Sequence, residues 1–160
     1  MRTRPVERGC PSLLDRLLDD APDQRQDRPA VAMMSNAQLR DAVLRDLHWL
    51  FNTTRAGGDA PGPVADSVLG FGLPALAGRP ASSWEPERLA RALADAIVRF
   101  EPRVIGSTVR VRPETPVDTA HNLLRFRIEA QLRAQPLPLA LLLRTEIDLE
   151  SGQSCLREAA

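Results

Sequence analysis

Apolar residues recur every three or four positions in two stretches of the chain, the spacing of an amphipathic helix. The first stretch follows Ser35, which forms a Ser-x-x-Gln capping box with Gln38 and so marks a helix start. Its apolar positions are Leu39, Val43, Leu47 and Leu50. The pattern predicts a helix from Ser35 to about Thr54.

The second helical stretch begins between Ser83 and Pro86 and runs to Phe100. Pro86 suits the first turn, where a missing N–H costs least. Its apolar positions Leu89, Leu93 and Ile97 lie four residues apart, so the stretch predicts a helix with one buried face.

After Phe100 the apolar period changes from 3.6 to two, which is typical of strands with one buried face. Strands are predicted over residues 104–112, 123–133, 139–149 and 154–158, the last two joined by a turn at Glu150–Gln153. In the second strand the residues expected to face inward are Leu124, Phe126, Ile128, Ala130 and Leu132, and those expected to face outward are Arg125, Arg127, Glu129, Gln131 and Arg133.

Helices followed by strands predict an α+β fold. We expect N-terminal helices packed on one face of a small, mainly antiparallel sheet of three to four C-terminal strands. One domain is expected over residues 35–160, preceded by a flexible segment, residues 1–34, with a short amphipathic helix over 12–19. The apolar stripe of that helix is too small to sustain it alone, so it must dock on the domain or on a partner.

The glycine-punctuated segment Ser67–Pro74 lies between the two long helices. We expect one helical turn from Asp66 and then a loop packed against the core.

Composition indicates a globular protein, with 43% hydrophobic and 26% charged residues in 160. Formal net charge is zero, so no bulk signal favours nucleic acid or an anionic membrane. All 21 basic residues are arginine. The chain shows no secretory signal pattern and no apolar run long enough to span a bilayer, so we expect a cytoplasmic protein without membrane insertion.

Residues with catalytic or metal-binding chemistry are sparse. Cys10 and Cys155 lie near opposite ends of the chain, and neither His48 nor His121 has an acidic or cysteine neighbour at ligand spacing. No nucleophile motif or phosphate-binding loop occurs. Glycoside hydrolysis needs two carboxyl groups at a defined separation, and no partner for Glu101 is marked. We therefore expect no catalytic residue, cofactor or metal.

Arginines recur on the outward positions of the predicted strands. They include Arg110, Arg112, Arg125, Arg127 and Arg133. No aromatic residues alternate with them, as a platform for single-stranded nucleic acid would require. The pattern favours a solvated sheet face or a face for an acidic protein partner, rather than a nucleic-acid site.

The junction Phe100-Glu101-Pro102-Arg103 separates the last helix from the first strand. Pro102 ends the helix and stiffens the backbone between a carboxylate and a guanidinium. One interpretation is a turn with a solvated ion pair, which stabilises little. The other is a docking contact, since the rigid arginine fork can orient a partner.

Five segments, taken in order, carry a family resemblance. They are Ser12–Leu17, Leu44–Thr53, Ser67–Pro74, Phe100–Arg103 and Ile147–Gly152. Together they resemble the TssE baseplate subunits of bacterial type VI secretion systems, within the wider family of phage baseplate wedge proteins labelled lysozyme-like. Three positions depart from the family: Gly70 replaces a common Asn, Phe71 a Tyr, and Ala75 a frequent Asp. These departures put polar contacts from that loop in doubt, but not the fold.

The resemblance implies a structural subunit without catalysis. Its implied partners are the baseplate subunits TssF, TssG and TssK and the sheath proteins TssB and TssC. Glu101, Pro102 and Arg103 are expected to contact the helical core bundle of the wedge, and a sheet edge is expected to start the sheath by β-augmentation, with the hairpin over 139–158 as our choice. Two alternatives remain: a peptidoglycan-cleaving hydrolase, and a free regulatory adaptor with the same fold.

Overall fold

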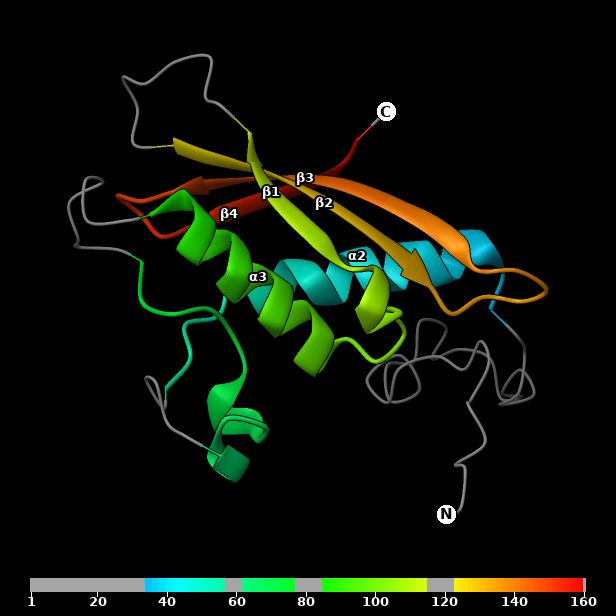
Figure 1. Ribbon diagram of the computed structural model, residues 1–160, viewed down its shortest axis with the longest axis horizontal. Helices are drawn as coiled ribbons and strands as arrows, with labels where there is room; N and C mark the ends of the chain where they lie inside the picture. The colour runs from blue at the N-terminus through cyan, green and yellow to red at the C-terminus, as the bar shows by residue number, and fades with distance from the viewer. Residues whose placement is uncertain (1–33, 57–61, 77–84, 115–122, 160) are drawn as a thin grey trace, which may run out of the picture.

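Four antiparallel strands and two long helices form the body of the molecule (Figure 1). The structure, a computed structural model, describes residues 34–56, 62–76, 85–114 and 123–159. The predicted helix over 12–19 lies outside the described residues. The elements are α2 (Asn36–Phe51), α3 (Pro86–Phe100), β1 (Arg110–Glu114), β2 (Leu123–Leu132), β3 (Leu139–Asp148) and β4 (Ser154–Glu158), with single 3₁₀ turns η1 (Gly62–Val64), η2 (Val68–Gly70) and η4 (Gly106–Thr108).

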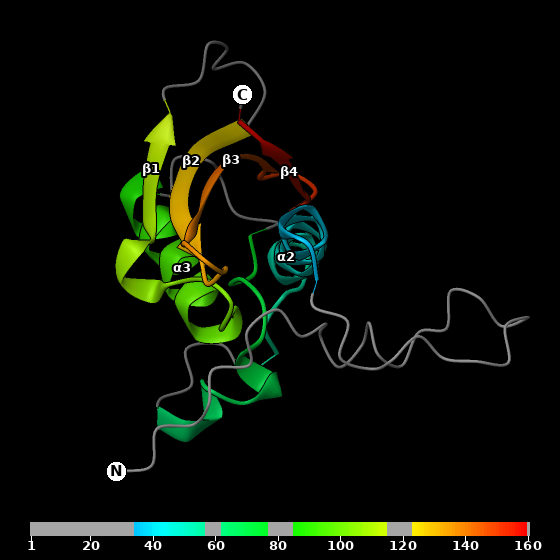
Figure 2. The same ribbon diagram turned by 90° about the vertical axis from the view of Figure 1, so that its right-hand side faces the viewer.

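The sheet has the order β1-β2-β3-β4, and every neighbouring pair is antiparallel. The sheet curves, and both helices lie on its concave face, with α3 under β1 and β2 and α2 beside β4 (Figure 2). This arrangement confirms the predicted α+β class and the single covered face.

Helix α2 begins as predicted. The Ser35 hydroxyl accepts from the Gln38 N–H (3.2 Å), and the Gln38 side chain accepts from the Ser35 N–H (2.9 Å), which completes the capping box. The helix ends at Phe51, before the predicted Thr54, because the backbone at Thr54 pairs with Leu73 in a short parallel bridge.

Helix α3 begins with Pro86 in its first turn and ends at Phe100, as predicted. Leu89, Leu93 and Ile97 are all buried, which confirms the face expected from their spacing. In β2, Phe126, Ile128 and Leu132 are buried, whereas the polar residues that alternate with them, Arg127, Glu129 and Gln131, point to the other face. The core therefore lies between the concave face of the sheet and the two helices.

The first predicted strand, 104–112, was wrong at its start. Val104 makes only an isolated bridge to Leu132, and η4 separates it from β1. The Thr108 hydroxyl donates to the Ile105 carbonyl (2.6 Å) and accepts from the Gln131 N–H (2.9 Å). The Thr108 side chain thus bonds β2 where a strand would have used its backbone. The alternation of Val109 and Val111 fits either arrangement, so the sequence pattern does not show which one occurs.

The segment Ser67–Pro74 is packed only in part. Its helical turn is confirmed as η2, capped by the Ser67 hydroxyl, and Leu73 is buried. The loop that follows packs as expected, with Phe71 against the core, whereas Val68 and Leu69, within the turn itself, are 88% and 52% exposed. The segment is held at its ends, where Phe71 packs edge-to-face on Phe100 and Asp66 pairs with Arg99 (3.0 Å).

The turn predicted at Glu150–Gln153 joins β3 to β4. The Ser151 hydroxyl and the Glu150 N–H donate to Asp148, and these hydrogen bonds lower the pKa of its carboxyl. No helix of the described residues combines the length and apolar character needed to cross a membrane.

Candidate interaction site

The junction after α3 folds back on itself rather than extending into solvent. The Glu101 N–H donates to the Ile97 carbonyl (2.9 Å), and the Glu101 carbonyl accepts from the Val104 N–H (3.1 Å). The Glu101 residue is 3% exposed, whereas Pro102 is exposed and Arg103 is half-buried. The three expected site residues therefore differ in exposure, and another molecule can reach Pro102 and part of Arg103 but not Glu101.

Three donors of Arg103 bind the Glu101 carboxylate. The guanidinium Nε donates to Glu101 Oε1 (2.7 Å) and Nη2 donates to Oε2 (2.5 Å), while the Arg103 backbone N–H also donates to Oε1 (3.0 Å). A two-point contact of this kind fixes the plane of the guanidinium. The solvated pair considered from the sequence is, in the structure, a largely buried one.

A second carboxylate reaches Arg103 from α2. Asp46 Oδ2 accepts from Arg103 Nη2 (2.5 Å), which links two segments 57 positions apart in the chain. Burial alone lowers the pKa of the Arg103 guanidinium, but the hydrogen bonds and charges of Glu101 and then Asp46 outweigh it and raise the pKa well above its usual range. Arg103 is therefore a permanent cation held between two carboxylates.

Asp46 also joins the junction to an exposed part of α2. Its other oxygen, Oδ1, accepts from Arg45 Nη2 (3.2 Å), and the Arg45 guanidinium lies 5.6 Å from the centre of the Trp49 ring. Trp49 is 44% exposed, an unusual position for a tryptophan on a helix that otherwise packs on a core. We call Arg45, Asp46, Trp49, Pro102 and Arg103 the junction surface.

Sequence reasoning assigned no role to Arg45, Asp46 or Trp49. A signal was present, since three charged or large side chains sit within five residues beside the apolar stripe of the helix. Their meeting with Arg103 depends on how α2 and α3 pack, which helical periodicity does not specify.

Arg133, the residue that follows β2, holds the junction from the other side. The Pro102 carbonyl accepts from Arg133 Nε (3.1 Å), and the Arg103 carbonyl accepts from the Arg133 N–H (2.8 Å). The exposed Pro102 ring is thus presented on backbone that is fixed at both ends.

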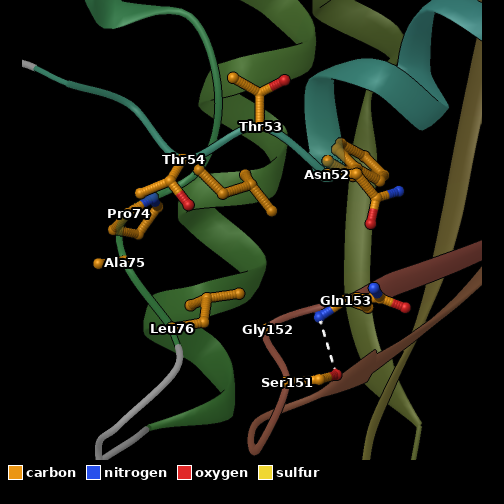
Figure 3. Close-up of a pocket in the computed structure, with 11 residues that line it drawn as sticks. Asn52, Thr53, Thr54, Pro74, Ala75, Leu76, Ser151, Gly152 and Gln153 are labelled. Carbon is orange, nitrogen blue, oxygen red and sulfur yellow. Dashed lines mark hydrogen bonds between the residues drawn. The ribbon is translucent and has the colours of Figure 1, made fainter.

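A cavity of about 230 Å³ lies elsewhere, between the end of α2, residues 73–76 and the β3–β4 turn (Figure 3). Asn52, Thr53 and Thr54 line one side, and Ser151–Gln153 line another. None of the described residues that line it has an ionisable side chain, so they offer amides and hydroxyls but no acid–base pair. Among the described residues, no group of three acidic, histidine or cysteine side chains is placed to hold a metal ion.

The sheet has two edges, and they differ in their free backbone groups. In β4 the backbone groups of Gln153 and Ala159 bond β3, so by alternation those of Ser154, Leu156 and Glu158 point outward. At Ser154 both outward groups are taken, because the Asn52 side chain accepts from its N–H (2.9 Å) and donates to its carbonyl (3.0 Å).

The β1 edge lacks a donor. Since Gln131 and Arg133 turn their backbone groups toward the β1 side, the odd-numbered residues of β2 pair with Arg110, Arg112 and Glu114. The backbone N–H and carbonyl groups of Val111 and Pro113 therefore point away from β2, at the free edge. Because Pro113 is a proline, it has no N–H to donate there. Of the two edges, β4 is the better template for an added strand at Leu156 and Glu158.

A family model described as baseplate wedge protein gp25 matches residues 37–137. The search of curated proteins and the search of solved structures returned no match.

Proposed function

The chain belongs to the baseplate wedge protein gp25 family, and from this premise we propose that it is a TssE-type subunit of a type VI secretion baseplate. The family is structural in general, and the chain is accordingly a structural component of a contractile-injection baseplate. The match runs from the first turn of α2 through α3, the junction, β1 and β2, and it includes three of the five segments that carry the resemblance to TssE, namely Leu44–Thr53, Ser67–Pro74 and Phe100–Arg103. We propose TssF, TssG and TssK as its partners in the wedge and a cytoplasmic location for the assembly.

The observation that best supports this proposal is that Glu101 and Asp46 hold the Arg103 guanidinium in a fixed position. We propose that the junction surface contacts the helical core bundle of the wedge, as expected for Glu101, Pro102 and Arg103. Glu101 is buried, so its part is to hold the Arg103 side chain, while Pro102, Arg103 and Trp49 are the groups that a partner touches. Arginine and tryptophan, here Arg103 and the exposed Trp49, are enriched at the centres of protein interfaces.

Co-purification with a TssF–TssG pair tests the contact. Arg103→Lys keeps the charge but removes the two-point geometry, so we expect at least a fivefold loss of captured TssF–TssG with a folded variant. Arg91→Lys on the exposed face of α3 is the matched control and should capture as the parent does.

Circular dichroism at the assay temperature shows whether each variant is folded. Undiminished capture by a folded Arg103→Lys chain, and also by a folded Trp49→Ala chain, would show that the junction surface is not the contact.

We also propose that β4 starts the sheath by accepting a strand from TssB or TssC. The outward backbone groups of Leu156 and Glu158 support this choice, as does the missing donor at Pro113 on the opposite edge. The hairpin over 139–158, chosen from the sequence, contains this edge.

The hydrolase alternative gains no support from the described residues. The Glu101 carboxylate is occupied by Arg103, and no carboxylate lines the cavity. Clearing of purified cell walls by the protein, lost on Glu101→Gln, would reinstate it. The adaptor alternative requires a chain that works outside any baseplate, and capture of TssF–TssG argues against it.

A further inference from the structure

Four arginines form a row across the convex face of the sheet. The register places Arg112 opposite Arg127, Arg127 opposite Arg144, and Arg144 opposite Arg157, so each strand contributes one residue. We call these four residues the arginine row. Both helices lie on the concave face, and no described element covers the row (Figure 2).

Like charges directly opposite one another destabilise an antiparallel sheet. The row repeats that unfavourable pairing three times, and the side chains remain open to solvent, with Arg127 and Arg144 at 40% and 57% exposure. An arrangement that costs stability and leaves the charges accessible is expected where the charges serve binding.

The row is only partly neutralised. Arg127 pairs with Glu129 (3.5 Å) and Arg144 with Glu114 (3.4 Å), and these glutamates lie on opposite sides of the row. Arg112 and Arg157, at the two ends, form no ion pair with any described residue. The result is a positive line flanked by mixed charges, with Arg110 and Glu129 on one side and Glu114 and the Arg125–Glu146 pair on the other.

We propose that the arginine row binds an acidic stripe on an α-helix of another protein. Neighbouring strands are about 4.8 Å apart, so the row is about 14 Å long. Helix residues three or four apart are separated by about 4.5–6 Å along the axis, a spacing close to that of neighbouring strands, so roughly ten residues of a helix would extend along the row.

The flanking glutamates favour this partner over nucleic acid. A duplex presents phosphates across a broad surface and would meet Glu114 and Glu129 as well as the row. A single helix touches only a narrow line, and basic residues beside its acidic stripe would pair with those glutamates. The proposal concerns a different face from the junction surface and stands whether or not the chain is a type VI subunit.

Fluorescence anisotropy with designed peptides tests the row. The probe is a labelled 21-residue alanine-rich helical peptide with four glutamates on one face, and its control has the same composition with the glutamates distributed around the helix. We expect the striped peptide to bind more tightly and to weaken as salt rises.

The double variant Arg112→Gln/Arg157→Gln should lose at least fivefold in affinity for the striped peptide. The matched control Arg88→Gln/Arg91→Gln removes the same charge from exposed positions on α3 and should lose less than twofold. The urea midpoint of the row variant should equal or exceed that of the parent, since like-charge pairs are relieved.

Three outcomes would overturn the proposal. They are equal binding of both peptides or of neither, equal loss in the two variants, and a lowered urea midpoint for the row variant, which would assign the arginines a structural role. A 20-base-pair duplex that binds through the row more tightly than the peptide would identify the partner as nucleic acid instead.

Discussion

At the scale of single residues, the Glu101–Arg103 pair decides how the junction can be used. A carboxylate that is 3% exposed and bound by three donors cannot also contact a partner directly. Its two oxygens accept hydrogen bonds from Arg103 and so orient the arginine side chain. The proposed interface therefore depends on Glu101 without including it.

Replacing Glu101 with Gln should destabilise the fold by about 2–3 kcal/mol, because a buried cation loses its charged partner while Asp46 remains. Urea unfolding measures the change. Glu129→Gln removes a glutamate that pairs with Arg127 and is 47% exposed, and it should cost less than about 0.5 kcal/mol. Similar losses for the two variants would mean that burial of the pair has no energetic consequence.

At the scale of elements, residues of α2 and of its C-terminal end contact the edge strand β4. Asn52 follows the last residue of the helix and bonds both outward backbone groups of Ser154, as a neighbouring strand would. At the other end of the two elements Arg40 pairs with Glu158 (3.2 Å). Asn52 thus occupies the outward backbone groups of Ser154, whereas Arg40 meets only the side chain of Glu158 and leaves the outward backbone groups of Leu156 and Glu158 unbonded by either residue.

Asn52→Ala should cost about 1–2 kcal/mol, since it leaves the Ser154 N–H and carbonyl without partners. Asn52→Asp should cost more, because a carboxylate oxygen then replaces the amide donor beside the Ser154 and His48 carbonyls. Amide hydrogen exchange at Ser154 reports the change, and it should accelerate in both variants. Unchanged exchange at Ser154 would contradict the role of Asn52 in occupying the Ser154 backbone groups.

At the scale of the whole molecule, the proposed interfaces lie on separate surfaces. The junction surface lies at the ends of the long helices, the β4 edge at one side of the sheet, and the arginine row on the convex face. Their separation allows several partners to be bound at once, as a baseplate component requires.

Glu158→Pro should abolish the start of sheath polymerisation, because it removes one outward N–H from β4 while leaving the β3 pairing intact. Glu158→Ala is the control, since it loses the same ion pair with Arg40 but keeps the N–H. Electron microscopy of sheaths formed from TssB and TssC on the assembled baseplate gives the readout. Sheaths of normal number with the proline variant would exclude β4 as the template.

Much of the fold was predictable because it depends on local patterns. The capping box at Ser35, the proline at the start of α3 and the alternation in β2 and β3 were all read correctly. The misread start of β1 shows the limit, because Thr108 replaces a strand contact with a side-chain contact that alternation does not reveal.

The sequence by itself determined the class of fold, the helix-to-strand junction and its three candidate residues, and the family match confirmed the resemblance. These follow from periodicity, from backbone limits at proline and from motif order, all of which are properties of neighbouring residues.

Only the tertiary structure decided what each candidate residue contacts. Asp46 meets Arg103 because two helices pack, Asn52 meets Ser154 across 102 positions, and the arginine row exists only in the register of four strands. Burial and register are long-range properties, so a chain pattern that marks an arginine as outward does not say which arginines stand beside it.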